Sequence, residues 1–118
     1  MTADNNQYEP VQRYSSREVE GAIAENDLGK LSNIVIAVSM YATDLQEAES
    51  LCARLATHED ENVRGNAILG FGHLARRFGK LNLPNVKEII ESGLQDKSEY
   101  VRGQAWAAAD DVAHFLGR

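Results

Sequence analysis

The feature of this 118-residue sequence that most constrains its fold is an internal repeat, in which residues 99–105 restate residues 61–67. Residues 61–67 are ENVRGNA and residues 99–105 are EYVRGQA, at an offset of 38. The same offset aligns further residues, namely 51–52 with 89–90, 74–75 with 112–113, and 78–80 with 116–118. Self-similarity at a fixed period of this size is typical of stacked supersecondary units. Each repeat is therefore predicted to be one such unit.

Apolar residues recur at three- and four-residue spacing, which predicts helices. The predicted helices cover about 15–26, 30–42, 43–56, 61–78, 85–95 and 99–116. Capping-box patterns mark Ser15 and Thr43 as helix starts. Leu28-Gly29 is expected to form the turn after the first helix, and Gly79 is expected to end the helix at 61–78. Residues 34–38 could instead be a buried strand, but the apolar pattern extends past ten residues, which favours a helix.

The repeated motif has a mechanical interpretation. Val63 and Val101 are expected to fill the gap between two paired helices. The arginine after each valine can reach carbonyl groups or an acidic side chain in the preceding turn, and the alanine three residues later allows close helix approach. Each pair keeps an unburied face until a neighbour stacks on it, so about three units are needed for stability.

At these residues the chain resembles HEAT repeats, which have an acidic turn, Val-Arg, and Ala a few positions on. The resemblance is good over about 44–118 and weak over 15–42. It implies an all-α fold, a short right-handed α-solenoid of about three helix pairs whose second helices line a concave surface. The predicted pairs are about 15–42, 44–79 and 85–117, within a single domain of residues 15–118 that follows a flexible arm at 1–14. HEAT repeats mostly bind proteins, although some bind nucleic acid and a few are lyases or glycosylases, so the motif supports the fold more than the function.

Charge and composition restrict the class of partner. The net charge of −6 argues against nucleic acid, since phosphate contacts need clustered Lys and Arg. It permits a partner with a basic surface, although solubility alone would also explain it. The longest apolar run, 34–38, is too short for a membrane span of ~20 residues, and no signal peptide is expected. The single cysteine, Cys52, excludes an internal disulfide and is expected in the core, so a cytoplasmic location is predicted.

No residue pattern predicts catalysis. His58, His73 and His114 lack the spacing of metal ligands, and no cofactor is expected. The three glycines between residues 65 and 72 lie within a helical pattern, which favours close helix packing over a phosphate loop. Adjacent Asp110 and Asp111 diverge by ~100° on a helix and so cannot flank one substrate. We therefore expect a protein that is not an enzyme.

Six residues are predicted to contact a protein partner: Trp106, Asp110, Asp111, His73, Asn66 and Arg77. Trp106 aligns with Ile68 and is expected beside the concave surface, where Trp is a frequent binding hot spot; burial against helix 85–95 is the alternative. Asp110-Asp111 lies mid-helix, where neither a cap nor the helix dipole explains two acids, although a solvated face would. Arg76-Arg77 and the histidines could equally be solvated.

The chain also resembles the small, acidic, single-domain immunity proteins that bacteria pair with toxins of contact-dependent growth inhibition systems. This resemblance rests on size, charge, fold and the absence of a catalytic motif. It implies a protein that binds and neutralises a cognate toxin, often a nuclease with a basic active site that an acidic surface would cover. A regulatory adaptor and a small lyase-like HEAT-repeat enzyme subunit are the alternatives, and homo-oligomerisation stays open.

Overall fold

The computed structural model describes residues 14–117, which form six α-helices and no strand. The helices are α1 (Ser16–Glu25), α2 (Leu28–Tyr41), α3 (Leu45–Leu55), α4 (Glu61–Phe78), α5 (Val86–Leu94) and α6 (Glu99–Leu116). The all-helical prediction is confirmed, and the strand alternative for residues 34–38 is wrong because they lie inside α2. Of the arm expected at 1–14, only Tyr14 lies within the described residues, and it packs against the core.

The first helix has the predicted start but a different end. Ser15 caps α1 in a complete capping box with Glu18, as predicted. Asn26 then takes a left-handed conformation with φ of 52°, and Asp27 caps the next helix by accepting a hydrogen bond from the backbone N–H of Lys30. The predicted turn at Leu28-Gly29 is therefore wrong, because Asp27 is an effective N-cap and starts α2 earlier.

A second aspartate corrects the start of α3. The carboxylate of Asp44 accepts from the backbone N–H of Glu47 at 3.1 Å, so Asp44 and not Thr43 is the N-cap. Asp60 caps α4 in the same way, and Gly79 ends it in a left-handed conformation with φ of 68°. Acidic side chains at helix starts also complement the positive end of the helix dipole.

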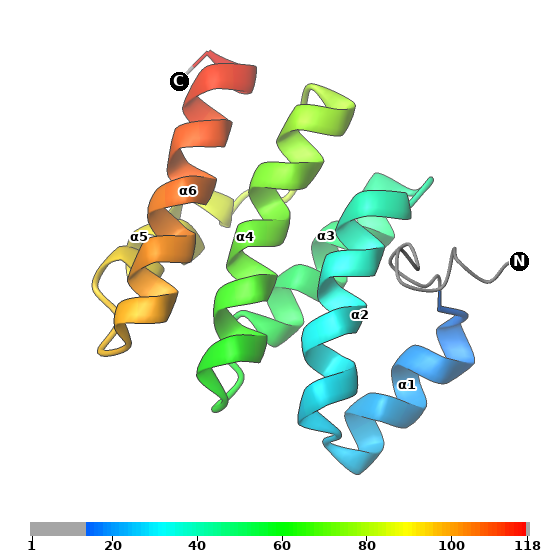
Figure 1. Cartoon of the computed structure of the whole chain (residues 1–118). Coiled ribbons are helices and arrows are strands. Elements are labelled where there is room, and N and C mark those ends of the chain that lie inside the picture. The colour runs from blue at the N-terminus through cyan, green and yellow to red at the C-terminus, as the bar shows by residue number, and fades with distance from the viewer. Residues whose placement is uncertain (1–13, 118) are drawn as a thin grey trace, which may run out of the picture.

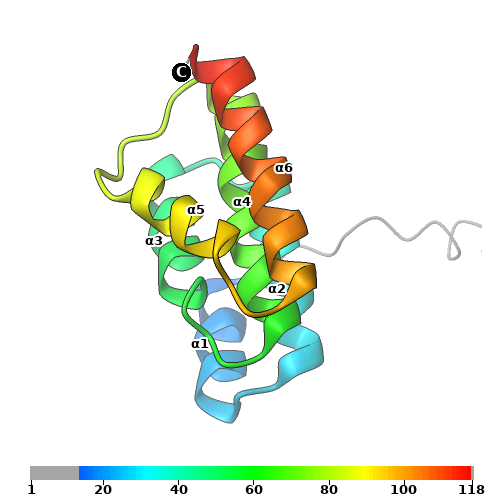
Figure 2. The ribbon, with the colours of Figure 1, turned by 90° about the vertical axis from the view of Figure 1, so that its left-hand side faces the viewer.

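The helices form two layers. In Figure 1, α2, α4 and α6 lie side by side, and the turned view in Figure 2 shows α1, α3 and α5 as a second layer, to the left of the first. The middle helix, α4, packs against α2, α3, α5 and α6. Val63 and Ala67 on α4 and their counterparts Val101 and Ala105 on α6 are fully buried, as the repeated motif predicts.

The repeated arginine ties each turn to the helix that follows it. On α4, Arg64 donates from Nη1 to the carbonyl oxygens of His58 and Glu59, both at 2.9 Å. Its Nε and Nη2 also donate to the two carboxylate oxygens of Asp96 in the next turn, both at 2.8 Å. On α6, Arg102 donates to the carbonyl of Asp96 at 2.7 Å, which is the equivalent bond one repeat later. The predicted role of the arginine is confirmed.

Glycines on α4 allow the close packing that the sequence predicts. A Cβ atom built on Gly70 would lie 2.7 Å from Sγ of Cys52, and one on Gly65 would lie 2.9 Å from the ring of Tyr100. Real Cβ atoms are essentially never this close to a neighbour, so larger side chains would push α3 and α6 away. Cys52 is fully buried as expected, and burial raises the pKa of its thiol to about 12.

Candidate protein-binding surface

A polar network joins α4 to the helices on either side. The amide of Asn66 donates to the carbonyl of Ser32 on α2 at 3.3 Å. Its Oδ1 accepts from the hydroxyl of Tyr100 at 2.5 Å and from Nε2 of Gln104 at 3.1 Å, both on α6. Asn66 is 7% exposed, so it offers a partner little surface of its own and mainly holds three helices in register.

A second cluster brings His73 and Asp111 together through Arg76. The Nη2 of Arg76 lies 2.8 Å from Nδ1 of His73, and its Nη1 lies 3.6 Å from Oδ2 of Asp111. Burial, followed by the charge of Arg76, lowers the pKa of His73, and Asp111 opposes this shift. The imidazole is therefore neutral at pH 7 and can accept from Arg76. Arg76 is exposed, as expected, whereas His73 is partly buried, because α4 and α6 lie close enough for Arg76 to contact both His73 and Asp111.

Arg77 has a structural role at the end of α2. It donates to the carbonyls of Ser39 at 3.0 Å and Ala42 at 2.7 Å, and its guanidinium carbon lies 5.0 Å from the ring centroid of Phe78. The last carbonyls of a helix lack partners within the helix, and a cation suits them. Arg77 is exposed, as expected for a solvated basic spot, but these contacts also hold its guanidinium against the end of α2. His58, also expected to be solvated, bonds Asn26 through Nε2 at 2.7 Å.

Among the described residues, the most exposed large apolar side chain is Trp106 on α6, at 66%. The alternative of core burial against α5 is therefore wrong. Asp110 follows it one turn later and is exposed, whereas Asp111 turns towards Gly72 on α4. We call Arg102, Gly103, Trp106 and Asp110 the end face of α6.

The repeat explains where this end face points. Its counterparts on α4, one repeat earlier, are all covered by the last helix pair. Arg64 meets Asp96, Gly65 lies against Tyr100, Ile68 lies against Gly93, and Gly72 lies against Ala108 and Asp111. The end face is thus the counterpart of the surface on which α4 receives α5 and α6. Arg102 and Gly103 were not predicted as surface residues, although their place in the repeat was the signal that could have identified them.

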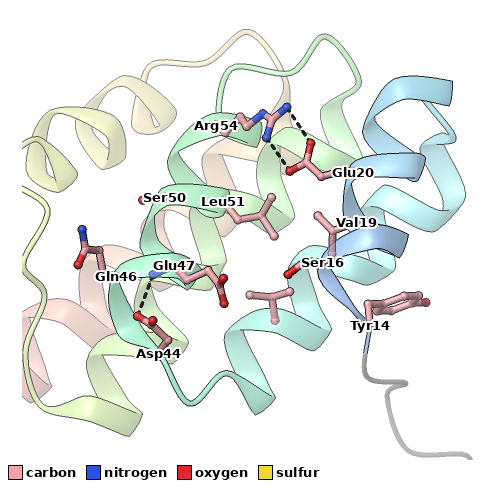
Figure 3. Close-up of a pocket in the computed structure, with 11 residues that line it drawn as sticks. Tyr14, Ser16, Val19, Glu20, Asp44, Gln46, Glu47, Ser50, Leu51 and Arg54 are labelled. Carbon is pink, nitrogen blue, oxygen red and sulfur yellow. Dashed lines mark hydrogen bonds and ion pairs between the residues drawn. The ribbon is translucent and has the colours of Figure 1, made fainter.

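A groove of about 470 Å³ lies between α1 and α3 (Figure 3). Val19, Val38 and Leu51 form its apolar part, and Arg54 and Glu20 close one end with an ion pair at 3.1 Å. The other polar side chains that line it are Tyr14, Ser16, Asp44, Gln46, Glu47 and Ser50. Sequence patterns did not predict this groove, because its two walls come from separate parts of the chain.

A second, more apolar groove of about 430 Å³ lies between α5 and α6. Leu83, Ile90, Val112 and Leu116 contribute to its lining. Leu81 and Pro84 of the loop that joins α4 to α5 also line it.

One buried charge was not predicted from the sequence. Glu49 on α3 is 1% exposed, and its Oε2 accepts from the backbone N–H groups of Asn82 at 2.6 Å and Leu83 at 3.2 Å. These bonds fix the loop between α4 and α5 onto α3. Glu49 lies four residues after buried Leu45 and three before buried Cys52, so it shares the apolar stripe of its helix, and this spacing is the signal that could have identified it.

Residues 14–117 contain no group of three or more side chains arranged to hold a metal ion. Within the same part of the chain, no helix has the length and apolar character needed to cross a membrane.

Comparisons with known proteins identify a shared fold. No protein-family model and no curated protein matches the sequence. Among solved structures, the chain is similar to one in the crystal structure of a CDI complex from Cupriavidus taiwanensis LMG 19424. The TM-score is 0.76 at 23% sequence identity, and the likeness covers 92% of this chain and 96% of that chain.

Proposed function

We propose that this chain is the immunity protein of a bacterial contact-dependent growth inhibition (CDI) system and that it neutralises a toxin by binding, without catalysis. The observation that carries the proposal is the fold shared with a chain of a CDI complex. The likeness spans 92% of one chain and 96% of the other, so it compares whole folds rather than one common helix pair.

We also propose that the helices are three HEAT-like pairs of a short right-handed α-solenoid, α1–α2, α3–α4 and α5–α6. The repeated turn contact supports this interpretation, since Arg64 binds the carbonyl of His58 as Arg102 binds that of Asp96. The two layers of alternating helices are consistent with it (Figures 1 and 2). The first pair has no such arginine, so its assignment depends on its place in the layers.

The proposed partner is a toxin domain with a basic surface, such as a nuclease active site. The excess of 18 acidic over 12 basic side chains supports this choice, because opposite charge accelerates encounter. Among the candidate residues, Trp106 and Asp110 are the most accessible and are proposed to contact the toxin directly. His73 and Asp111 would contribute as partly buried residues joined through Arg76, and Asn66 and Arg77 would hold α4 against α2.

The proposed site of action is the bacterial cytoplasm, where a nuclease toxin would meet its substrate. The test is to purify the chain with the toxin domain encoded beside it, measure binding by calorimetry, and express the chain in cells that receive the toxin. Wild type is expected to bind the toxin and restore growth.

Surface variants test the assignment of the contact. Trp106→Ala and Asp110→Lys are expected to weaken binding by roughly 30-fold or more, the loss typical of a hot spot. Glu25→Lys on exposed α1 makes the same change of charge away from α6 and should bind normally. A wild-type chain that neither binds nor protects would refute the immunity function, whereas normal binding by both α6 variants would refute only the proposed surface.

A further inference from the structure

We infer that the end face of α6 (Arg102, Gly103, Trp106 and Asp110) pairs with the same face of a second copy of this chain. The two α6 helices run antiparallel, with Trp106 near the two-fold axis. This inference concerns the chain alone and does not depend on the proposed function. Because the same face is proposed to contact the toxin, a second copy and the toxin would compete for it.

The residues of the end face correspond in the repeat to residues of α4 that other helices cover. Ile68, the counterpart of Trp106 on α4, is 2% exposed beneath the last helix pair, whereas Trp106 is 66% exposed. Gly65 lies tightly against Tyr100, whereas a Cβ atom built on its counterpart Gly103 would meet nothing within 4 Å. An exposed tryptophan of this size on a helix face is typical of a surface that another protein covers.

The charges beside Trp106 identify a second copy as the occupant. Arg102 lies four residues before Trp106 and Asp110 lies four residues after it, so the three side chains share one stripe of the helix. In an antiparallel pair centred on Trp106, the arginine of each copy faces the aspartate of the other. A two-fold interface repeats every contact, so one dimer contains two such ion pairs.

Arg102 also has the hydrogen-bond donors that this contact needs. Within residues 14–117 its guanidinium donates to one carbonyl, that of Asp96, through Nη1. Its counterpart Arg64 makes the same kind of bond and in addition binds both oxygens of a carboxylate through Nε and Nη2. Asp110 of a second copy would supply the corresponding carboxylate to Arg102.

The expected dimer is weak and depends on concentration. The contact is built on one helix of 18 residues, about 27 Å long. Interfaces smaller than about 1,200 Å² are typical of transient association. Gly103 favours the contact, because it has no side chain to separate the two helices.

The test is analytical ultracentrifugation of the purified chain, without toxin, from micromolar to millimolar concentration. Wild type is expected to pass from monomer to dimer, and the emission of Trp106, the single tryptophan, should shift to the blue over the same range. Trp106→Ala is expected to weaken dimerisation at least tenfold, and Glu25→Lys should behave as wild type. A wild-type chain that stays monomeric, or a Trp106→Ala chain that dimerises normally, would overturn the inference.

Charge reversal tests the antiparallel arrangement. Arg102→Asp alone places a new carboxylate against Asp110 of the other copy, and Asp110→Arg alone places two arginines together, so neither variant should self-associate. An equimolar mixture of the two restores opposite-charge pairing across the interface and should form a heterodimer. Circular dichroism checks that each variant is folded. A mixture that stays monomeric while wild type dimerises would refute the arrangement and point to a different occupant of the face.

Discussion

Replacing Asp96 with alanine should test whether the arginine contact really joins successive turns. The two carboxylate oxygens of Asp96 each accept a hydrogen bond from Arg64 at 2.8 Å. One of them also accepts from the backbone N–H of Ser98 at 2.8 Å. The Arg64 and Asp96 side chains are only 12% and 15% exposed, so water cannot easily replace these bonds.

The size of the effect follows from this shielding. An exposed ion pair contributes about 0–1 kcal/mol, and removing one partner of a buried pair costs about 3–5 kcal/mol. The two parallel hydrogen bonds between Arg64 and Asp96 favour the cost of a buried pair. Arg64 would keep its two bonds to carbonyl oxygens in the variant, and this lowers the expected cost. We therefore expect Asp96→Ala to lower the free energy of unfolding by about 2–3 kcal/mol, which corresponds to a fall in Tm of roughly 10 °C for a domain of this size.

The assay is urea and thermal unfolding at pH 7, followed by circular dichroism at low protein concentration. Glu20→Ala is the matched control, because its pair with Arg54 is 62% and 51% exposed and should contribute less than about 1 kcal/mol. If Asp96→Ala costs no more than Glu20→Ala, the contact does not join the turns and the reasoning is wrong.

The pH dependence gives an independent check on the same residue. The hydrogen bonds from Arg64 hold the pKa of Asp96 below its ordinary value of 3.8. A carboxyl whose pKa is lower in the folded state stabilises the fold fully above its unfolded value and loses that contribution as the pH falls through the folded value. The difference in stability between wild type and Asp96→Ala should therefore be constant near neutral pH and shrink below about pH 4.

Three further predictions concern packing and the α4–α5 loop. In urea unfolding, Gly70→Ala should destabilise the fold by about 1–3 kcal/mol, because its methyl group would overlap Sγ of Cys52. The control Gly21→Ala, in open space on α1, should instead stabilise the fold by up to ~1 kcal/mol. The Cys52 thiol, whose pKa burial raises to about 12, should resist a thiol reagent in the native chain and react once urea unfolds it; rapid native labelling would contradict this. Glu49→Ala should speed hydrogen exchange and proteolysis in the 80–85 loop and cost roughly 1–3 kcal/mol, and an unchanged loop would show that the buried carboxylate is not what fixes it.

Much of the fold could be predicted because its signals are local. The bounds of α4 and α6 matched the prediction, since the repeat fixes their starts and glycine with positive φ ends both. The errors at Leu28 and Thr43 have one cause. An aspartate beside each site caps its helix more effectively than the pattern that the prediction used.

The candidate surface was less predictable because exposure depends on which helices stack together. Trp106 and Ile68 occupy the same position in the repeat, yet one is exposed and the other is buried. The bonds from Arg77 to α2 and from Asn66 to both neighbouring helices join residues far apart in the sequence, and no local spacing encodes them. Sequence reasoning could therefore propose the residue types of a binding surface but not their accessibility.

The central position of α4 has a consequence for how the chain folds. In a long repeat array each unit touches only its neighbours, so folding can begin in one unit and spread. Here α4 packs on α2, α3, α5 and α6 at once, so the unfolding of any one of these four helices would expose buried side chains of α4. Residues 28–116 should therefore unfold in one cooperative transition, and α1, which packs mainly on α2, is the element that can fray separately.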